Sequence, residues 1–111
     1  MTISGVINGI LWRELSENCL ESMLEAKCCS IAAQAFDCEN RKMNGMGKRD
    51  WPDRLFLFRG GVDVFVEFKR FGESATPKQA KLHARLRKLG YTVLVIDRVE
   101  QFVKRVLVYG T

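Results

Sequence analysis

Hydrophobic positions change their spacing several times along the chain, and each change marks a predicted element. Over 3–15 the apolar residues recur at i, i+3 and i+4, the spacing of an amphipathic helix, although two glycines weaken the pattern. We expect 1–16 to be a packing or dimerisation helix and favour the dimer interface, because a chain of 111 residues has few other surfaces to offer.

A stronger helical stripe follows over 17–36. Its apolar members are Leu20, Met23, Leu24, Cys28, Ile31, Ala32 and Ala35. An acidic row beside the stripe contains Glu14, Glu17, Glu21 and Glu25. Most of this row is interpreted as a solvated face. Glu25 lies closest to the apolar stripe and is the member expected to point inward, with Glu21 as the fallback.

The middle of the chain carries the pattern of a β-hairpin. Arg54–Phe58 and Val62–Phe71 are predicted strands, and Arg59–Gly61 is the turn between them. The preceding segment, 37–50, is predicted as a polar loop with room for a short strand around Asn40–Met43.

The last third begins with the helix-capping sequence Thr-Pro-Lys-Gln at 76–79. The helix is predicted to run to Leu89 and to stop at Gly90, with leucines at 82, 86 and 89 as its buried stripe. Tyr91–Asp97 is almost continuously apolar and predicts a central strand buried on both faces. A helix over Val99–Val108, or a helix and a short strand, closes the chain.

This order of elements predicts a single α/β domain, 1–111, with a mixed sheet flanked by helices. No apolar run approaches the ~20 residues of a membrane helix, and no signal peptide is recognised, so we expect a cytoplasmic protein. The four cysteines form no CxxC pair and there is one histidine, His83, a pattern that argues against a typical structural zinc site. The cysteines are interpreted as small buried residues in a reducing compartment.

Positive charge gathers in two places, within a formal net charge of +5. Lys78, Lys81, Arg85 and Lys88 share one face of the 77–89 helix and repel each other unless an anion lies against them. A solvated basic face is the common alternative, but we favour contact with a nucleic-acid backbone. Cations of the 37–50 loop, Lys48 and Arg49 among them, fit a phosphate contact and a solvated loop equally well.

The candidate catalytic residues lie on and beside the second hairpin strand. Glu67 and Lys69 project from the same face of an apolar strand, where burying charge is costly. A hairpin centred on Gly60 would set Asp53 directly opposite Glu67, which requires a three-residue turn. A two-residue turn would put the two carboxylates on opposite faces. The alternative to a site is a cross-strand ion pair between Glu67 and Lys69 on a solvated face.

Two carboxylates at matching register predict a divalent metal site. Mg²⁺ prefers oxygen ligands, which Asp53, Glu67 and the backbone carbonyl of Phe68 would supply. Lys69 would orient or help to deprotonate a water molecule and stabilise the charge on a phosphodiester. Gln79 is explained by helix capping alone, yet it would also reach the site if its helix begins near Lys69. His83 is interpreted as structural.

Three segments together resemble the VRR-NUC domain of the PD-(D/E)xK nuclease superfamily. They are Trp-Pro-Asp-Arg-Leu at 51–55, Val-Glu-Phe-Lys-Arg at 66–70, and the run over 76–97 from Thr-Pro-Lys-Gln to Val-Leu-Val-Ile-Asp. The resemblance spans about 20–97. The glycine-rich segment that usually precedes Pro-Asp is here Met-Gly-Lys-Arg-Asp at 46–50, a mild departure.

The resemblance implies a restriction-endonuclease-like core that cleaves DNA with Mg²⁺ or Mn²⁺. Asp53 and Glu67 are similar to the family's metal ligands, Lys69 to its catalytic lysine and Gln79 to its supporting glutamine, and Glu25 best fits its helix glutamate. Stand-alone phage-type members imply a homodimer selective for branched DNA such as four-way (Holliday) junctions, acting in the host cytoplasm without a small-molecule cofactor. The alternatives are a flap nuclease and a non-catalytic nucleic-acid-binding module.

Overall fold

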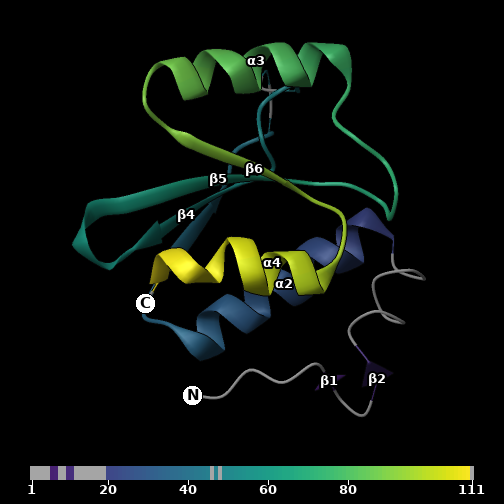
Figure 1. Ribbon diagram of the computed structural model, residues 1–111, viewed down its shortest axis with the longest axis vertical. Helices are drawn as coiled ribbons and strands as arrows, with labels where there is room; N and C mark the ends of the chain where they lie inside the picture. Colours follow the sequence, from purple (N-terminus) through teal and green to yellow (C-terminus); the bar gives the residue numbers. More distant parts are fainter. Residues whose placement is uncertain (1–5, 8–9, 12–19, 46, 48, 111) are drawn as a thin grey trace.

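A mixed four-stranded sheet forms the centre of the molecule, with helix α3 on one face and helices α2 and α4 on the other (Figure 1). The computed structural model describes residues 6–7, 10–11, 20–45, 47 and 49–110. The strands lie in the order β3 (Glu39–Lys42), β4 (Arg54–Phe58), β5 (Val62–Phe68) and β6 (Thr92–Ile96). The helices are α2 (Glu21–Ala35), α3 (Pro77–Lys88) and α4 (Val99–Arg105). The predicted α/β class is confirmed.

Strand β5 is the most deeply buried element of the sheet. Val64, Val66 and Phe68 pack into the larger core beneath α2 and α4. Phe65, on the opposite face, packs with Leu86 of α3 and with β6. Because β5 is buried on both faces from Val64 to Phe68, a charged group in this part of the strand needs a partner or a ligand.

The hairpin has the register that a turn centred on Gly60 requires. Arg54 is opposite Val66 and Phe58 is opposite Val62, across the three-residue turn Arg59–Gly61. Gly60 adopts a φ of 79°, the left-handed region in which a side chain is strained. The predicted odd-length turn is therefore confirmed, and the same register continued by one residue brings position 53 to position 67.

The prediction that Tyr91–Asp97 forms a central strand is wrong. β6 is an edge strand, parallel to β5 and joined to it through α3. It is apolar because α3 covers one of its faces and α4 the other. Its outer edge is also occupied: Arg87 of α3 donates to the carbonyl of Val93 at 2.7 Å, and Arg105 of α4 donates to that of Val95 at 3.4 Å.

The described part of the N-terminal segment is not helical. Val6–Ile7 (β1) and Ile10–Leu11 (β2) pair as two short antiparallel strands. Three of these four residues are β-branched, which favours strand over helix. The rest of 1–16 lies outside the described residues, so a dimerisation role stays a prediction. At the other end of the chain, Leu107–Gly110 forms a 3₁₀ turn rather than a strand.

Both long helices bury a narrower stripe than predicted. In α2 the buried residues are Leu24, Cys28 and Ala32. Leu20, which precedes the helix as its N-cap, and Met23 in its first turn are exposed. Leu89 is the C-cap residue of α3 and is also exposed, and His83 is buried instead. Glu14 and Glu17 lie outside the described residues.

Within the described residues, no helix has both the length and the apolar character that crossing a membrane would require.

Candidate metal centre and nucleic-acid groove

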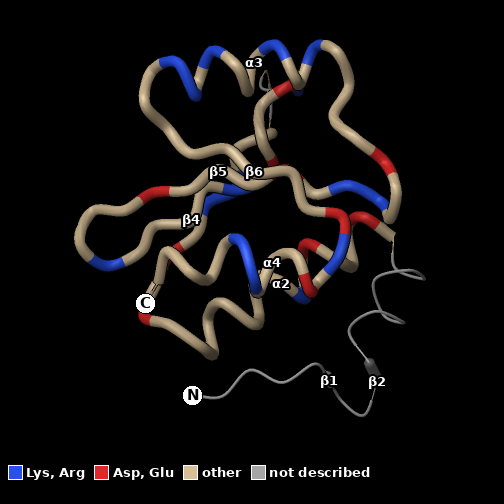
Figure 2. Tube along the Cα trace, in the orientation of Figure 1, with Lys and Arg blue, Asp and Glu red and all other residues tan. Residues whose placement is uncertain are grey.

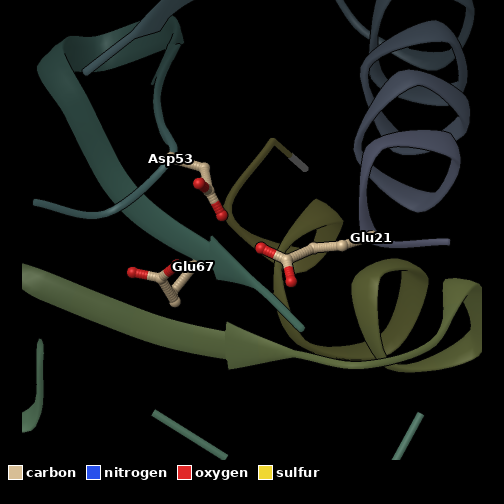
Figure 3. Close-up of side chains that lie close together, drawn as sticks. All are labelled: Glu21, Asp53 and Glu67. Atoms are coloured by element: carbon tan, nitrogen blue, oxygen red, sulfur yellow. The ribbon is translucent and has the colours of Figure 1, made fainter. Parts of the chain in front are cut away.

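Three carboxylates converge at one end of the sheet (Figure 3). Glu21 is the first residue of α2, Asp53 immediately precedes β4, and Glu67 lies near the end of β5. One ligand oxygen of each lies within 4.8 Å of the others. Asp53 is 4% exposed and Glu67 1% exposed. Carboxylates this close and this buried repel each other unless protons or a cation are present.

The Asp53 carboxylate is held by a backbone donor and a side-chain donor. The N–H of Phe68 donates to Oδ2 at 2.6 Å, and the Asn44 amide donates to Oδ1. The Asp53 carbonyl accepts from the N–H of Met43 at 2.9 Å, which extends the β3–β4 pairing by one residue and fixes the backbone. The peptide of Phe68 thus reaches the site through its N–H, and a metal-ligand role for its carbonyl stays a proposal.

Sequence reasoning missed Asn44. In the sequence it is one polar residue of a loop, and nothing in its immediate neighbours marks it as a partner of Asp53. The only available signal was the predicted short strand at 40–43, which would end beside the start of the next strand and so bring the following residue close to Asp53.

Glu67 is approached by two side chains of α3. The amide of Gln79 lies 3.5 Å from Oε2, and Nε2 of His83 lies 3.4 Å from Oε1. Gln79 also completes the predicted capping box, because its Oε1 accepts from the N–H of Thr76 at 3.0 Å and its own N–H donates to the Thr76 hydroxyl at 3.2 Å. The capping role and the site role of Gln79 are therefore compatible.

In the absence of metal, burial raises the pKa values of all three carboxylic acids. Burial is the largest cause that raises the pKa of Asp53 to about 7, opposed by the Phe68 N–H and reinforced by the nearby Glu67 charge. Burial also raises the pKa of Glu67 to about 7, opposed by a hydrogen bond with Asp53 and by the charge of Lys69. The pKa of Glu21 is raised by burial and then by Asp53. A cation bound here would replace protons that the buried acids otherwise retain.

Lys69 is the first residue after β5 and is 8% exposed. Its N–H donates to the carbonyl of Ile96 at 2.9 Å, which carries the β5–β6 pairing one residue further and fixes the lysine backbone. Among the described residues, no acid lies within ion-pair distance of its ammonium group. The alternative interpretation, an ion pair between Lys69 and Glu67 on a solvated face, is therefore not what forms: both residues are buried, and the ammonium is available to a ligand.

The structure places Glu21, the fallback, beside Asp53 and Glu67 and turns Glu25, the preferred residue, towards other partners. Glu25 lies one turn into α2 and its Oε2 accepts from Arg54 at 2.7 Å and lies 3.3 Å from Lys42 Nζ. Glu21 is the residue that joins Asp53 and Glu67. The reason is positional: α2 approaches the site with its first turn, so the residue at its start reaches the site and the next turn faces β3 and β4.

A groove of about 1270 Å³ opens between the loop after β3 and the outer side of α3. Arg49 and Trp51 line it from the loop. From α3 it is lined by the predicted basic stripe, Lys78, Lys81, Arg85 and Lys88. Figure 2 shows lysine and arginine positions spaced along α3. None of the five cations forms an ion pair with an acid among the described residues, and Lys48 lies outside them.

The groove and the carboxylates share Asn44, which lines the groove and donates to Asp53. A strand of nucleic acid in the groove would therefore lie beside the carboxylates. Arg87, by contrast, is committed to the β6 edge and takes no part in the groove.

Comparisons with known proteins agree with this geometry. The chain is 38% identical over 85 residues to "Putative nuclease p44" of Acyrthosiphon pisum secondary endosymbiont phage 1, covering 77% of this chain and 86% of that protein. A solved structure described as a VRR_NUC domain superposes with a TM-score of 0.69 at 30% identity, covering 79% of this chain and 92% of the other. The chain belongs to the VRR-NUC family of nucleases. No family model matches its sequence.

The donor set of this VRR-NUC chain fits a divalent metal ion. It consists of three carboxylates with no histidine or cysteine in the group, the hard oxygen chemistry that suits Mg²⁺ and Mn²⁺. Oε1 of Glu67 is buried without a hydrogen-bond partner among the described residues. A site built only for structural packing would not leave such an oxygen unpaired.

Proposed function

We propose that this VRR-NUC nuclease is a metal-dependent DNA endonuclease that hydrolyses phosphodiester bonds in branched DNA such as four-way junctions. The observation that carries the proposal is the convergence of Glu21, Asp53 and Glu67. A groove lined by cations shares Asn44 with this site, because Asn44 lines the groove and donates to Asp53. The carboxylates give a place for a metal ion, and the groove gives a place for the phosphate backbone.

The carboxylates and Lys69 have different proposed roles in this site. Glu21, Asp53 and Glu67 would hold Mg²⁺ or Mn²⁺, with the Phe68 carbonyl as a further oxygen. When bound, the ion supplies Lewis acidity to a water molecule and to the scissile phosphate. Lys69 orients that water and stabilises negative charge that develops on the phosphate oxygens. The Lys69 ammonium is suited to this task because it is nearly buried, where electrostatic interactions are stronger than in water.

The cations of the groove hold the DNA. We propose that Lys78, Lys81, Arg85, Lys88 and Arg49, which line the groove, contact backbone phosphates. A phosphate contact by Lys48, which lies outside the described residues, stays a prediction. Contacts of this kind position a duplex without reading its sequence, which suits an enzyme that selects a DNA structure.

Branch selectivity and dimerisation rest on the family resemblance and on the phage origin of the relative. A two-fold dimer would present two identical sites, as is needed to cut paired strands at a junction. The host cytoplasm is the proposed location. The free thiols of Cys29 and Cys38 suit its reducing conditions.

Cleavage assays on matched substrates test the proposal. We would incubate the purified protein with a four-way junction, a flap and a linear duplex of the same sequence, with Mg²⁺, with Mn²⁺ and with EDTA. We expect cleavage of the junction with either metal, none with EDTA, and loss of at least ~100-fold in rate for Lys69→Ala. Lys104→Ala is the matched control, because Lys104 is an exposed lysine of α4 paired with Glu100.

Each alternative outcome has a definite meaning. Unchanged cleavage by Lys69→Ala would refute the role of this lysine. Faster cleavage of the flap than of the junction would replace the substrate with the flap. Metal-independent DNA binding without cleavage in Mn²⁺ would identify a binding module.

A further inference from the structure

We propose that His83 is a positioning residue that fixes the Glu67 carboxylate for metal binding, an inference that rests on the metal site proposed above. His83 lies four residues after Gln79 on α3, so both side chains project from the same face of the helix. Gln79 approaches Oε2 of Glu67 and His83 approaches Oε1. Side chains of α3 thus approach both oxygens of the Glu67 carboxylate.

The contact between His83 and Glu67 joins two atoms that have no hydrogen-bond partner among the described residues. Nε2 of His83 and Oε1 of Glu67 are both buried and form no hydrogen bond with any described residue. They lie 3.4 Å apart without forming a hydrogen bond. Catalytic hydrogen bonds are often long or poorly aligned before ligands bind, and a small rotation of either side chain would align this one.

His83 acts through Glu67 and is not itself a metal ligand. The group of mutually close ligand atoms contains Glu21, Asp53 and Glu67, and among the described residues it contains no histidine. His83 is 1% exposed and lies on α3, which packs against the sheet face opposite α2. With both of its oxygens approached by α3, the Glu67 carboxylate has a restricted orientation before a metal ion arrives.

This arrangement links α3 to the site as well as to the DNA. The exposed face of α3 lines the groove, and its buried face holds Glu67. Partners that orient a metal ligand typically change metal affinity by about 10- to 100-fold when removed.

Mn²⁺ affinity of the intact protein is the direct test, measured by isothermal titration calorimetry without DNA. We expect His83→Leu, which fills the space but donates no hydrogen bond, to weaken Mn²⁺ binding about 10-fold. His83→Gln, which restores a donor, should recover most of the affinity. In cleavage assays the His83→Leu variant should need about 10-fold more Mn²⁺ for half-maximal rate, with the KM for DNA unchanged.

Leu86→Ala separates positioning from packing. Leu86 lies on the buried side of α3 but packs against Phe65 and Val93, away from the carboxylates. It should lower the thermal midpoint and leave Mn²⁺ affinity unchanged below that midpoint. If His83→Leu does not fold, His83→Met replaces it as the variant without a donor.

Three results would overturn the inference. Wild-type Mn²⁺ affinity in His83→Leu would do so, as would equal weakening by His83→Leu and His83→Gln. Equal weakening by Leu86→Ala would show that packing alone is responsible. A wild-type protein that binds no Mn²⁺ would overturn the proposed metal site itself, and the calorimetry distinguishes that result from the other three.

Discussion

Glu21 and Glu25 are the sharpest contrast at the scale of single residues, because they lie one turn apart on α2 with different partners. We expect Glu21→Gln to weaken Mn²⁺ binding and to slow cleavage by at least ~10-fold, since it removes one of three converging carboxylates. Glu25→Gln should leave Mn²⁺ affinity within about two-fold of wild type. Because it breaks the ion pair with Arg54, it should lower the free energy of unfolding by about 0.5–1 kcal/mol.

Calorimetry and urea denaturation measure the two effects separately. If Glu25→Gln weakened metal binding and Glu21→Gln had no effect, the metal-binding carboxylate of α2 would be Glu25.

Some site residues could be predicted from the sequence and others could not, for physical reasons. Asp53, Glu67 and Lys69 follow from strand alternation and the register of one hairpin, which short-range rules determine. Glu21 and Glu25 have the same helical spacing, and only the way α2 docks on the sheet separates them. His83 depends on the rotation of α3 in the same way, which no local pattern specifies.

Among the elements, the turn between β4 and β5 depends on the left-handed backbone of Gly60. Gly60 has a φ of 79°, and a Cβ at this position would have open space around it, so an alanine there is strained by its backbone alone. We expect Gly60→Ala to lower the free energy of unfolding by about 1–2 kcal/mol. Gly45→Ala is the matched control, because Gly45 also has open space around it but no positive φ. Urea denaturation in EDTA gives both values, and equal stability of the two variants would contradict the left-handed turn.

Elements were predictable where their signals are local. The capping box at Thr76 and the turn centred on Gly60 each lie within a few residues, and both were predicted correctly. The place of β6 in the sheet was not predictable from its apolar run, because cover by two helices produces the same composition in an edge strand as in a central one. Arginines from α3 and α4 occupy its outer carbonyls, which disfavours extension of the sheet at this edge as the basis for a dimer.

The distribution of charge over the whole molecule predicts how DNA binding responds to salt. Cations on α3 and on the loop after β3 line one groove, away from α4. We expect the affinity for a four-way junction to fall steeply as salt rises, because bound phosphates release counterions. Lys81→Ala and Arg85→Ala should each reduce the slope of log affinity against log salt by about 1.

Fluorescence anisotropy in EDTA measures this slope without cleavage. Lys104→Ala, on α4, is the control and should keep the wild-type slope. Equal slopes in all four proteins would exclude the groove as the phosphate-binding surface.

The buried acids make the stability of the metal-free protein depend on pH. Asp53 and Glu67 have pKa values of about 7 in the folded protein, against ordinary values of 3.8 and 4.5. Between these limits the folded state retains protons that the unfolded state has released, so the free energy of unfolding should fall as pH rises through about 5 to 7. Burial lowers the pKa of His83 and acts in the opposite sense, but only below its ordinary value of 6.5.

Urea denaturation from pH 5 to pH 8 in EDTA checks this dependence, and Asp53→Asn isolates the carboxylates because it removes one acid and leaves His83 in place. We expect a shallower fall in the variant than in the wild type. Mn²⁺ should oppose the fall, since it binds the ionised carboxylates that become available as pH rises. Wild-type stability that rises with pH in EDTA, in parallel with Asp53→Asn, would mean that the acids are already ionised below pH 7. The electrostatic repulsion between the ionised carboxylates would then be offset by the charge of Lys69 and by the Phe68 N–H, without need of a metal ion.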